Sequence, residues 1–259
     1  MEAILETRNL SIQFGGVVGA SEISISVDAG EVIGVIGANG AGKTTFVNLV
    51  TGYLRPSSGS IHYMGNDVTT LTPREITDLG IRRSFQIPQL FGEMTALENM
   101  LTAQSIAPKV TRSYWIPLLR SDTMEIAMER LEHFGIADSA DQLVSMLPQG
   151  VRKILDIAMA TVGAPQLVML DEPTSGVSAE EKFEIMDIVM DAFARQEVTV
   201  LFIEHDMELV ERYANRVLAF YNGLVIADTD TRQALANPQV REYVVGREIH
   251  RTHAPQGEN

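Results

Sequence analysis

Apolar and polar residues alternate near the start of the chain, and short apolar runs recur further along. Residues 4–14 and 22–28 alternate like two strands of a half-exposed sheet. The later runs have the length of strands rather than of long helices. The further strands predicted from them are 31–36, 60–63, 81–86, 167–170, 198–203, 217–220 and 224–227. Asn222-Gly223 between the last two predicts a tight hairpin turn.

Helical patterns occur between these strands. Thr95-Ala96-Leu97-Glu98 and Ser178-Ala179-Glu180-Glu181 are capping boxes, and Gly135 follows an amphipathic stretch as a stop signal. The predicted helices are 44–50, 95–104, 123–134, 150–162 and 178–195. Strands that alternate with helices, with a helical block inserted among them, predict an α/β fold with a parallel sheet and a helical subdomain.

Composition narrows the class of protein. The chain has 259 residues, is 45% hydrophobic and 21% charged, and is expected to fold as a water-soluble globule. Its formal net charge is 20 − 34 = −14. This argues against nucleic acid as the main partner, because nucleic-acid binding needs a basic footprint.

Missing sequence features exclude further classes. The chain has no cysteine, which excludes disulfides, thiolate catalysis and cysteine-ligated zinc. The N-terminal residues show no secretory signal, and no apolar run approaches the roughly 20 residues that span a bilayer. We therefore expect a cytoplasmic protein whose membrane role, if it has one, comes through a partner.

A phosphate-binding loop is the clearest motif. Gly37-Ala38-Asn39-Gly40-Ala41-Gly42-Lys43-Thr44 fits G-x-x-x-x-G-K-[ST], between a predicted strand and a predicted helix. Its glycines let successive N–H groups point inward as a nest for phosphate oxygens. Lys43 is expected to reach the β- and γ-phosphates and the Thr44 hydroxyl to ligate Mg²⁺. The loop predicts binding of ATP with Mg²⁺.

Two adjacent acids follow a second buried strand. The apolar run Leu167–Leu170 ends in Asp171 and Glu172. A carboxylate at the end of such a strand can hold Mg²⁺, and a neighbouring carboxylate can act as general base toward water. We therefore expect Asp171 to bind the metal and Glu172 to be catalytic.

These motifs resemble the ATP-binding subunits of ABC transporters over nearly the whole chain. The resemblance implies a P-loop NTPase with a RecA-like core, an antiparallel β subdomain and an inserted helical subdomain. It predicts one ABC ATPase domain over 4–246, with the helical subdomain at about 89–163 and a disordered tail at 247–259.

The family's motifs assign further roles. Gln86 in Ser84-Phe85-Gln86 matches the Q-loop, which touches Mg²⁺ and the attacking water and senses the permease. His205 in the switch loop, 202–206, contacts the γ-phosphate. Phe14 falls where an aromatic ring stacks on adenine, although an ordinary strand phenylalanine explains it too. The nucleotide-binding residues implied are Phe14, Gly37, Asn39, Gly40, Ala41, Gly42, Lys43, Thr44 and Thr45; the catalytic ones are Glu172, His205, Gln86 and Lys43; the metal ligands are Thr44, Gln86 and Asp171.

The chain departs from the family pattern in two places. Where the signature loop reads Leu-Ser-Gly-Gly-Gln, the chain reads Leu147-Pro148-Gln149-Gly150-Val151. Pro148 replaces the serine hydroxyl that bonds the γ-phosphate held by the opposite subunit, and a charge-assisted bond of that kind is worth roughly 1.5–3 kcal/mol. Ser178 stands where the D-loop usually has aspartate. Since two subunits sandwich ATP head to tail in this family, we expect a different ATP-binding partner with an intact signature, although a homodimer is possible.

Several sequence features resemble the branched-chain amino acid uptake group, which includes importers of urea and short amides. They are Phe14-Gly15-Gly16, Arg83-Ser84-Phe85-Gln86, Leu90–Thr95 and Ala236–Gly246. The resemblance implies membrane permease subunits, indirectly a solute-binding protein, and a position on the inner face of the cell membrane. Two alternatives remain: a regulatory subunit that barely hydrolyses ATP and an ATPase of the lipopolysaccharide-export type. A soluble ABC protein acting on ribosomes or in DNA repair is disfavoured by the net charge of −14.

Overall fold

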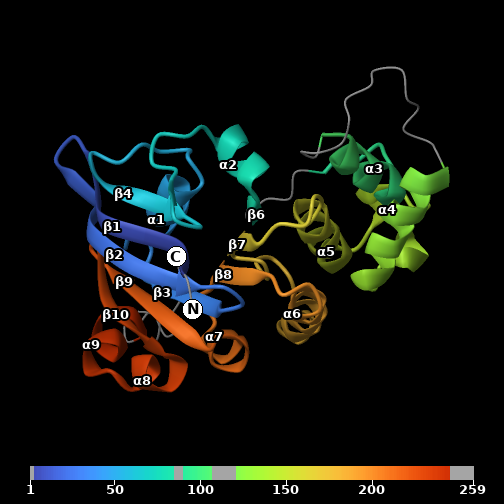
Figure 1. The fold of residues 1–259 in the computed structure, drawn as a ribbon. Helices are drawn as coiled ribbons and strands as arrows, with labels where there is room; N and C mark the ends of the chain where they lie inside the picture. Colours follow the sequence, from blue (N-terminus) through green and yellow to red (C-terminus); the bar gives the residue numbers. More distant parts are fainter. Residues whose placement is uncertain (1–2, 85–89, 107–120, 246–259) are drawn as a thin grey trace, which may run out of the picture. The chain divides into compact units, whose positions relative to one another are not determined.

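The computed structural model describes residues 3–84, 90–106 and 121–245 of the chain. It divides into two compact units (Figure 1). The first contains Met1–Thr72 and Leu201–Asn259, and the second contains Pro73–Val200. The predicted disordered tail at 247–259 lies outside the described residues, and the limits of the helical subdomain at 89–163 stay a prediction.

An antiparallel sheet opens the first unit. Its strands are β1 (Ala3–Phe14), β2 (Val17–Asp28), β4 (Ser58–Tyr63) and β5 (Asn66–Asp67), in the order β2-β1-β4-β5. Alternate apolar side chains of β1 and β2 are buried, as their pattern predicts. β2 begins earlier than residue 22, because Gly15 and Gly16 form a two-residue hairpin between paired Phe14 and Val17.

The first unit also holds the strand that precedes the phosphate loop. That strand, β3 (Val32–Gly37), runs parallel to β9 (Arg216–Tyr221), and β10 (Leu224–Asp230) pairs with β9 as a hairpin. On its other side β3 neighbours β8 (Thr199–Ile203). The helices of this unit are α1 (Lys43–Val50), α7 (Met207–Tyr213), α8 (Thr231–Ala236) and α9 (Pro238–Val240), followed by a π-helical turn, η3 (Arg241–Val245).

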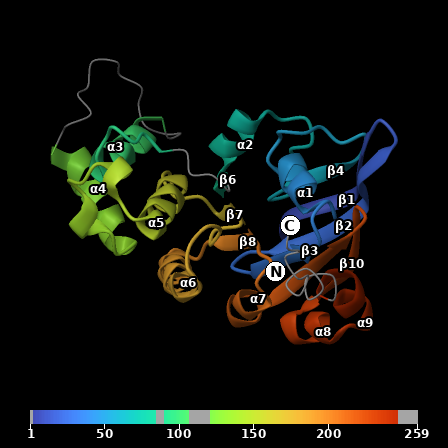
Figure 2. The same cartoon turned by 180° about the vertical axis from the view of Figure 1, so that it is seen from behind.

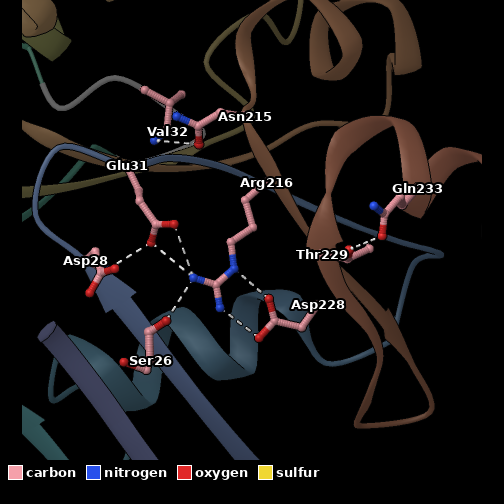
Figure 3. A network of polar contacts seen from close by, with 9 residues as sticks. All are labelled: Ser26, Asp28, Glu31, Val32, Asn215, Arg216, Asp228, Thr229 and Gln233. Atoms are coloured by element: carbon pink, nitrogen blue, oxygen red, sulfur yellow. Dashed lines mark hydrogen bonds and ion pairs between the residues drawn. The ribbon is translucent and has the colours of Figure 1, made fainter. Parts of the chain in front are cut away.

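Arg216 joins the strands of this unit at the start of β9 (Figure 3). Its guanidinium donates to the Asp228 carboxylate of β10 at 2.6 and 2.9 Å, to Glu31 at 3.0 Å and to the Ser26 carbonyl of β2 at 2.9 Å. The hydrogen bond to Asp228, with the charges of Asp228 and Glu31, raises the pKa of Arg216. One permanent charge therefore fastens β2, the turn before β3, β9 and β10 to one another.

Replacing Arg216 with Ala is expected to lower the free energy of unfolding by roughly 1.5–3 kcal/mol, because the partners of this charge are part-buried. Thermal unfolding followed by circular dichroism measures the change. The control is Arg195→Ala, because Arg195 pairs with Asp191 on an exposed helix face, with side chains 60% and 57% accessible. Surface pairs of that kind contribute less than about 1 kcal/mol. An equal shift for both variants would contradict the role given to the Arg216 network.

The second unit contains a pair of parallel strands and most of the long helices (Figure 2). β6 (Ile81–Ser84) runs parallel to β7 (Leu167–Asp171), and Leu167 through Leu170 are all buried. Its helices are α2 (Pro73–Leu79), α3 (Ala96–Ile106), α4 (Ser121–His133), α5 (Gln149–Ala160) and α6 (Ala179–Ala194), with 3₁₀ turns η1 (Ala137–Ser139) and η2 (Val144–Met146).

The predicted helices agree with the structure to within two residues at their ends. The capping box at Ser178 is present, since its hydroxyl accepts from the Glu181 N–H and the Glu181 side chain accepts from the Ser178 N–H. Helices α2, α7, α8 and α9 were not predicted. They have at most seven residues and too few turns to show a helical period. Within the part of the chain that the structure describes, no helix is long and apolar enough to cross a membrane.

Candidate nucleotide site

The phosphate loop lies in the first unit, between the end of β3 and the start of α1. Gly42 has φ 109°, and a Cβ placed there would lie 2.7 Å from the Gly19 carbonyl oxygen. A Cβ on Gly37 would lie 2.6 Å from the Phe220 carbonyl oxygen. Side chains are therefore excluded at both ends of the loop, which explains why its glycine positions are fixed.

The turn between β9 and β10 is hydrogen-bonded to the phosphate loop. The Gly223 N–H donates to the Ala41 carbonyl at 2.8 Å, and the Gly223 carbonyl accepts from the Ser21 N–H of β2 at 2.8 Å. Phe46 of α1 packs against Phe220 of β9, with ring centroids 5.5 Å apart. The antiparallel sheet and the β9–β10 hairpin thus fix the backbone of the loop before any ligand arrives.

Lys43 and the start of α1 form the charged end of the loop. The Lys43 side chain is buried, and its ammonium donates to the Gly37 carbonyl at 2.5 Å and the Ala38 carbonyl at 3.2 Å. No side chain caps α1. Its first N–H groups therefore point their partial positive charge outward beside Lys43. Asn39, Gly40 and Thr44 are exposed, whereas Ala41 is buried and Thr45 is half-buried.

Phe14 lies close to this loop. The residue is 46% exposed, and its ring lies against Gly19, where an added Cβ would lie 2.6 Å from the Phe14 Cε2 atom. The carbonyl of the same Gly19 approaches Gly42 of the phosphate loop. If Phe14 were an ordinary core residue of the strand, its side chain would be buried. The partly exposed ring beside the loop favours the stacking role that the sequence left open.

His205 follows β8 and is half-buried. Its backbone N–H donates to the carboxylate of Glu204, which is only 5% exposed, at 3.3 Å. Asp206 caps α7 by accepting from the Glu208 N–H. The segment between strand and helix is thus held by side chains on both sides of His205. The contact of His205 with the γ-phosphate stays a prediction.

Asp171 and Glu172 lie at the end of β7 in the second unit. Asp171 is 6% exposed, and its carboxylate accepts from Arg83 of β6 at 2.6 Å. Glu172 is half-buried and has φ 50°, a left-handed conformation that is uncommon for any residue with a β-carbon. Lys153 of α5 approaches the Glu172 carbonyl at 3.4 Å, and the Ser175 N–H donates to it at 3.1 Å. Such strain is often stored at functional sites, which supports the role predicted for Glu172.

The segment that departs from the family signature, 147–151, lies in the second unit at the start of α5. Pro148 is the N-cap residue of α5, with φ −54°, so it begins the helix without breaking it. Gln149 lies against Gly176, where an added Cβ would be 2.4 Å from the Gln149 Nε2 atom. Gly150 is buried against Ile185 of α6. The larger side chain at position 149 is accommodated by the glycine of the loop after β7.

Sequence reasoning missed two cations beside the predicted acids, Arg83 and Lys153. Arg83 lay within a motif that carried the family resemblance, but nothing in the sequence showed where its side chain points. The predicted site residue Gln86 lies outside the described residues. The phosphate loop, Phe14 and His205 belong to one unit and the two acids to the other.

Comparison with known proteins identifies the family. The family model described as ABC transporter matches residues 20–175. The chain belongs to the ABC transporter family. Among similar proteins, the high-affinity branched-chain amino acid transport ATP-binding protein BraF of Pseudomonas aeruginosa is 32% identical, covering 94% of this chain and 98% of its own. A probable branched-chain amino acid transport ATP-binding protein, LivG of Archaeoglobus fulgidus, is 34% identical over 94% and 95%.

Solved structures of the family have the same fold. An ATP-binding cassette of an ABC transporter in its ADP conformation matches with a TM-score of 0.84 and 32% identity, covering 94% of this chain and 98% of that one. A nucleotide-free cassette matches with a TM-score of 0.82 and 31% identity over 93% and 98%. The predicted fold class and the prediction of an ABC-type ATPase are therefore confirmed. The comparisons support this reading over the lipopolysaccharide-export alternative.

Proposed function

We propose that the chain is the ATP-hydrolysing subunit of an importer for branched-chain amino acids or related small amino acids and amides. The observation that carries the proposal is the end-to-end similarity to BraF and LivG, at 32% and 34% identity over 94% of the chain. It works with membrane permease subunits, on the inner face of the cell membrane, and indirectly with a solute-binding protein. Its second ATP-binding partner is a different subunit with an intact signature loop.

The predicted metal ligands are side-chain oxygens, which suit Mg²⁺ bound together with a nucleotide. In the described part of the chain no three His, Cys, Asp or Glu side chains gather as a metal site. Thr44, Asp171 and Gln86 would each supply one oxygen ligand, and the remaining positions around the ion would be taken by phosphate oxygens and water. Magnesium is usually bound in this way, through few protein ligands. When bound, it neutralises charge on the phosphates during transfer.

Residues of the chain then bind the nucleotide and carry out hydrolysis. Phe14 stacks on adenine, and the N–H groups of residues 37–45 with the Lys43 ammonium hold the phosphates. Glu172 accepts a proton from the attacking water, while His205 donates toward the γ-phosphate and Gln86 orients the water. Positive charge fixed in place before the reaction stabilises the charge that develops on the transferring group. The resemblance assigns all of these groups to one nucleotide.

The test uses the complete transporter. The chain is tagged in its source cell and purified with its associated subunits, which are placed in liposomes with the solute-binding protein of the complex. We expect leucine, isoleucine or valine, or a short amide, to raise ATP hydrolysis several-fold over the level without solute. Sugars and peptides serve as control solutes. Purification without any permease, or equal hydrolysis with every solute, would contradict the proposal.

A further inference from the structure

A buried ion pair ties the predicted metal-binding acid to the neighbouring strand. The Arg83 Nη2 and Asp171 Oδ2 atoms are 2.6 Å apart, and the two side chains are only 9% and 8% exposed. Arg83 lies opposite Met169 in the parallel register of β6 and β7, so its side chain reaches forward to the end of β7. Both residues belong to the second unit.

The Arg83 guanidinium places a positive charge beside the Asp171 carboxylate. Water is largely excluded from the contact. One carboxylate oxygen of Asp171 is therefore hydrogen-bonded to a cationic side chain. A divalent cation approaching that carboxylate meets a positive charge already in place. At about 6 Å, even with the dielectric constant of water, the repulsion weakens cation binding about tenfold, and more in a protein interior.

We propose that Arg83 is a positioning residue that fixes the orientation of the Asp171 carboxylate. Its positive charge weakens the binding of free divalent cations to that carboxylate when no nucleotide is present. The negative phosphates of ATP offset the repulsion, so Asp171 accepts the metal together with the nucleotide. The inference rests on the proposed function, because it takes Asp171 as the metal-binding acid. It adds a specificity device that selects the metal–nucleotide complex over the free ion.

The test measures binding of Mn²⁺, a paramagnetic substitute for Mg²⁺, to the full chain without nucleotide, from the electron paramagnetic resonance signal of the free ion. Arg83→Gln is expected to bind Mn²⁺ about tenfold or more tightly than the unchanged protein. Arg83→Lys keeps the charge and is expected to bind as weakly as the unchanged protein. Adding Asp171→Asn to Arg83→Gln is expected to abolish the gain.

Arg82→Gln is the matched control. Arg82 is the preceding residue of β6, and its guanidinium donates to the Val162 carbonyl at 3.2 Å rather than to Asp171. This variant is expected to lose stability without binding Mn²⁺ more tightly. A folded Arg83→Gln variant that binds Mn²⁺ no better than the unchanged protein overturns the proposal. If Arg83→Gln does not fold, a tenfold gain in Arg83→Lys, which keeps the charge, overturns it too.

The proposed function is tested separately in the same samples. ATP binding to the unchanged protein in excess chelator depends on the phosphate loop and not on Arg83. If the unchanged protein does not bind ATP under these conditions, the proposed nucleotide site is wrong. The Mn²⁺ measurement would still show whether Arg83 weakens metal binding at Asp171. Normal ATP binding with no Mn²⁺ gain in Arg83→Gln would refute only the role given to Arg83.

Discussion

Replacing Glu172 with Gln is expected to lower ATP turnover by the assembled transporter at least about 100-fold, while ATP still binds. A general base contributes roughly 10²–10⁴-fold to the rate, and an amide of the same shape cannot accept the proton of the attacking water. Turnover is measured as phosphate release, and binding with a fluorescent ATP analogue. Unchanged turnover would mean that this subunit's site is not the working one, which would favour the regulatory alternative.

The chain offers a matched control for this variant. Glu197 has the same left-handed conformation, with φ 53°, and lies exposed before β8. Glu197→Gln is expected to leave turnover unchanged. Glu172→Gly separates strain from chemistry, because glycine adopts positive φ without steric cost. It is expected to remove activity as fully as Glu172→Gln without lowering the melting temperature.

The phosphate loop could be predicted from sequence because its fixed residues form one continuous motif. Gly37 and Gly42 approach neighbouring carbonyls so closely that only glycine fits, and Lys43 folds back onto the carbonyls of its own loop. The strand before Asp171 could be predicted as well, since a continuous apolar run is typical of a strand buried on both faces. Both patterns are continuous in the sequence, although the carbonyls that exclude a side chain at Gly37 and Gly42 belong to Phe220 and Gly19, which are distant along the chain.

Contacts between distant segments could not be predicted in this way. The pairing of Arg83 with Asp171 depends on the register of two strands, and the approach of Gln149 to Gly176 depends on how α5 packs beside the loop after β7. Neither leaves a local pattern. The hairpin at Gly15 and Gly16 did leave one, and reading it as a two-residue turn would have placed the start of β2 at Val17.

Replacing Pro148 with Ser is expected to raise ATP turnover by the chain on its own by roughly 10- to 150-fold. That range corresponds to the roughly 1.5–3 kcal/mol of one charge-assisted hydrogen bond to the γ-phosphate of the opposite subunit. The backbone accepts the change. Pro148 has φ −54° and ψ 152° at the N-cap of α5, close to φ −66° and ψ 163° at the serine N-cap of α6.

The control is Pro238→Ser, which changes a proline at the start of a different helix, α9. It is expected to leave turnover as it was. Fast turnover by the unchanged chain alone, equal to that of the chain with its co-purified partner, would contradict the requirement for a different subunit. Turnover of each preparation is compared at the same concentration of ATP and of this chain.

Combining Pro148→Ser with Glu172→Gln tests whether the gain comes from a composite site. In a self-paired chain each ATP uses Lys43 and Glu172 of one copy and the signature loop of the other. The double variant is therefore expected to fall to the level of Glu172→Gln alone. Such non-additivity is the mark of residues that act as one unit. A double variant that kept the gain would mean that Pro148→Ser acts outside this site. The shared nucleotide, and with it the argument for an unlike partner, would then be wrong.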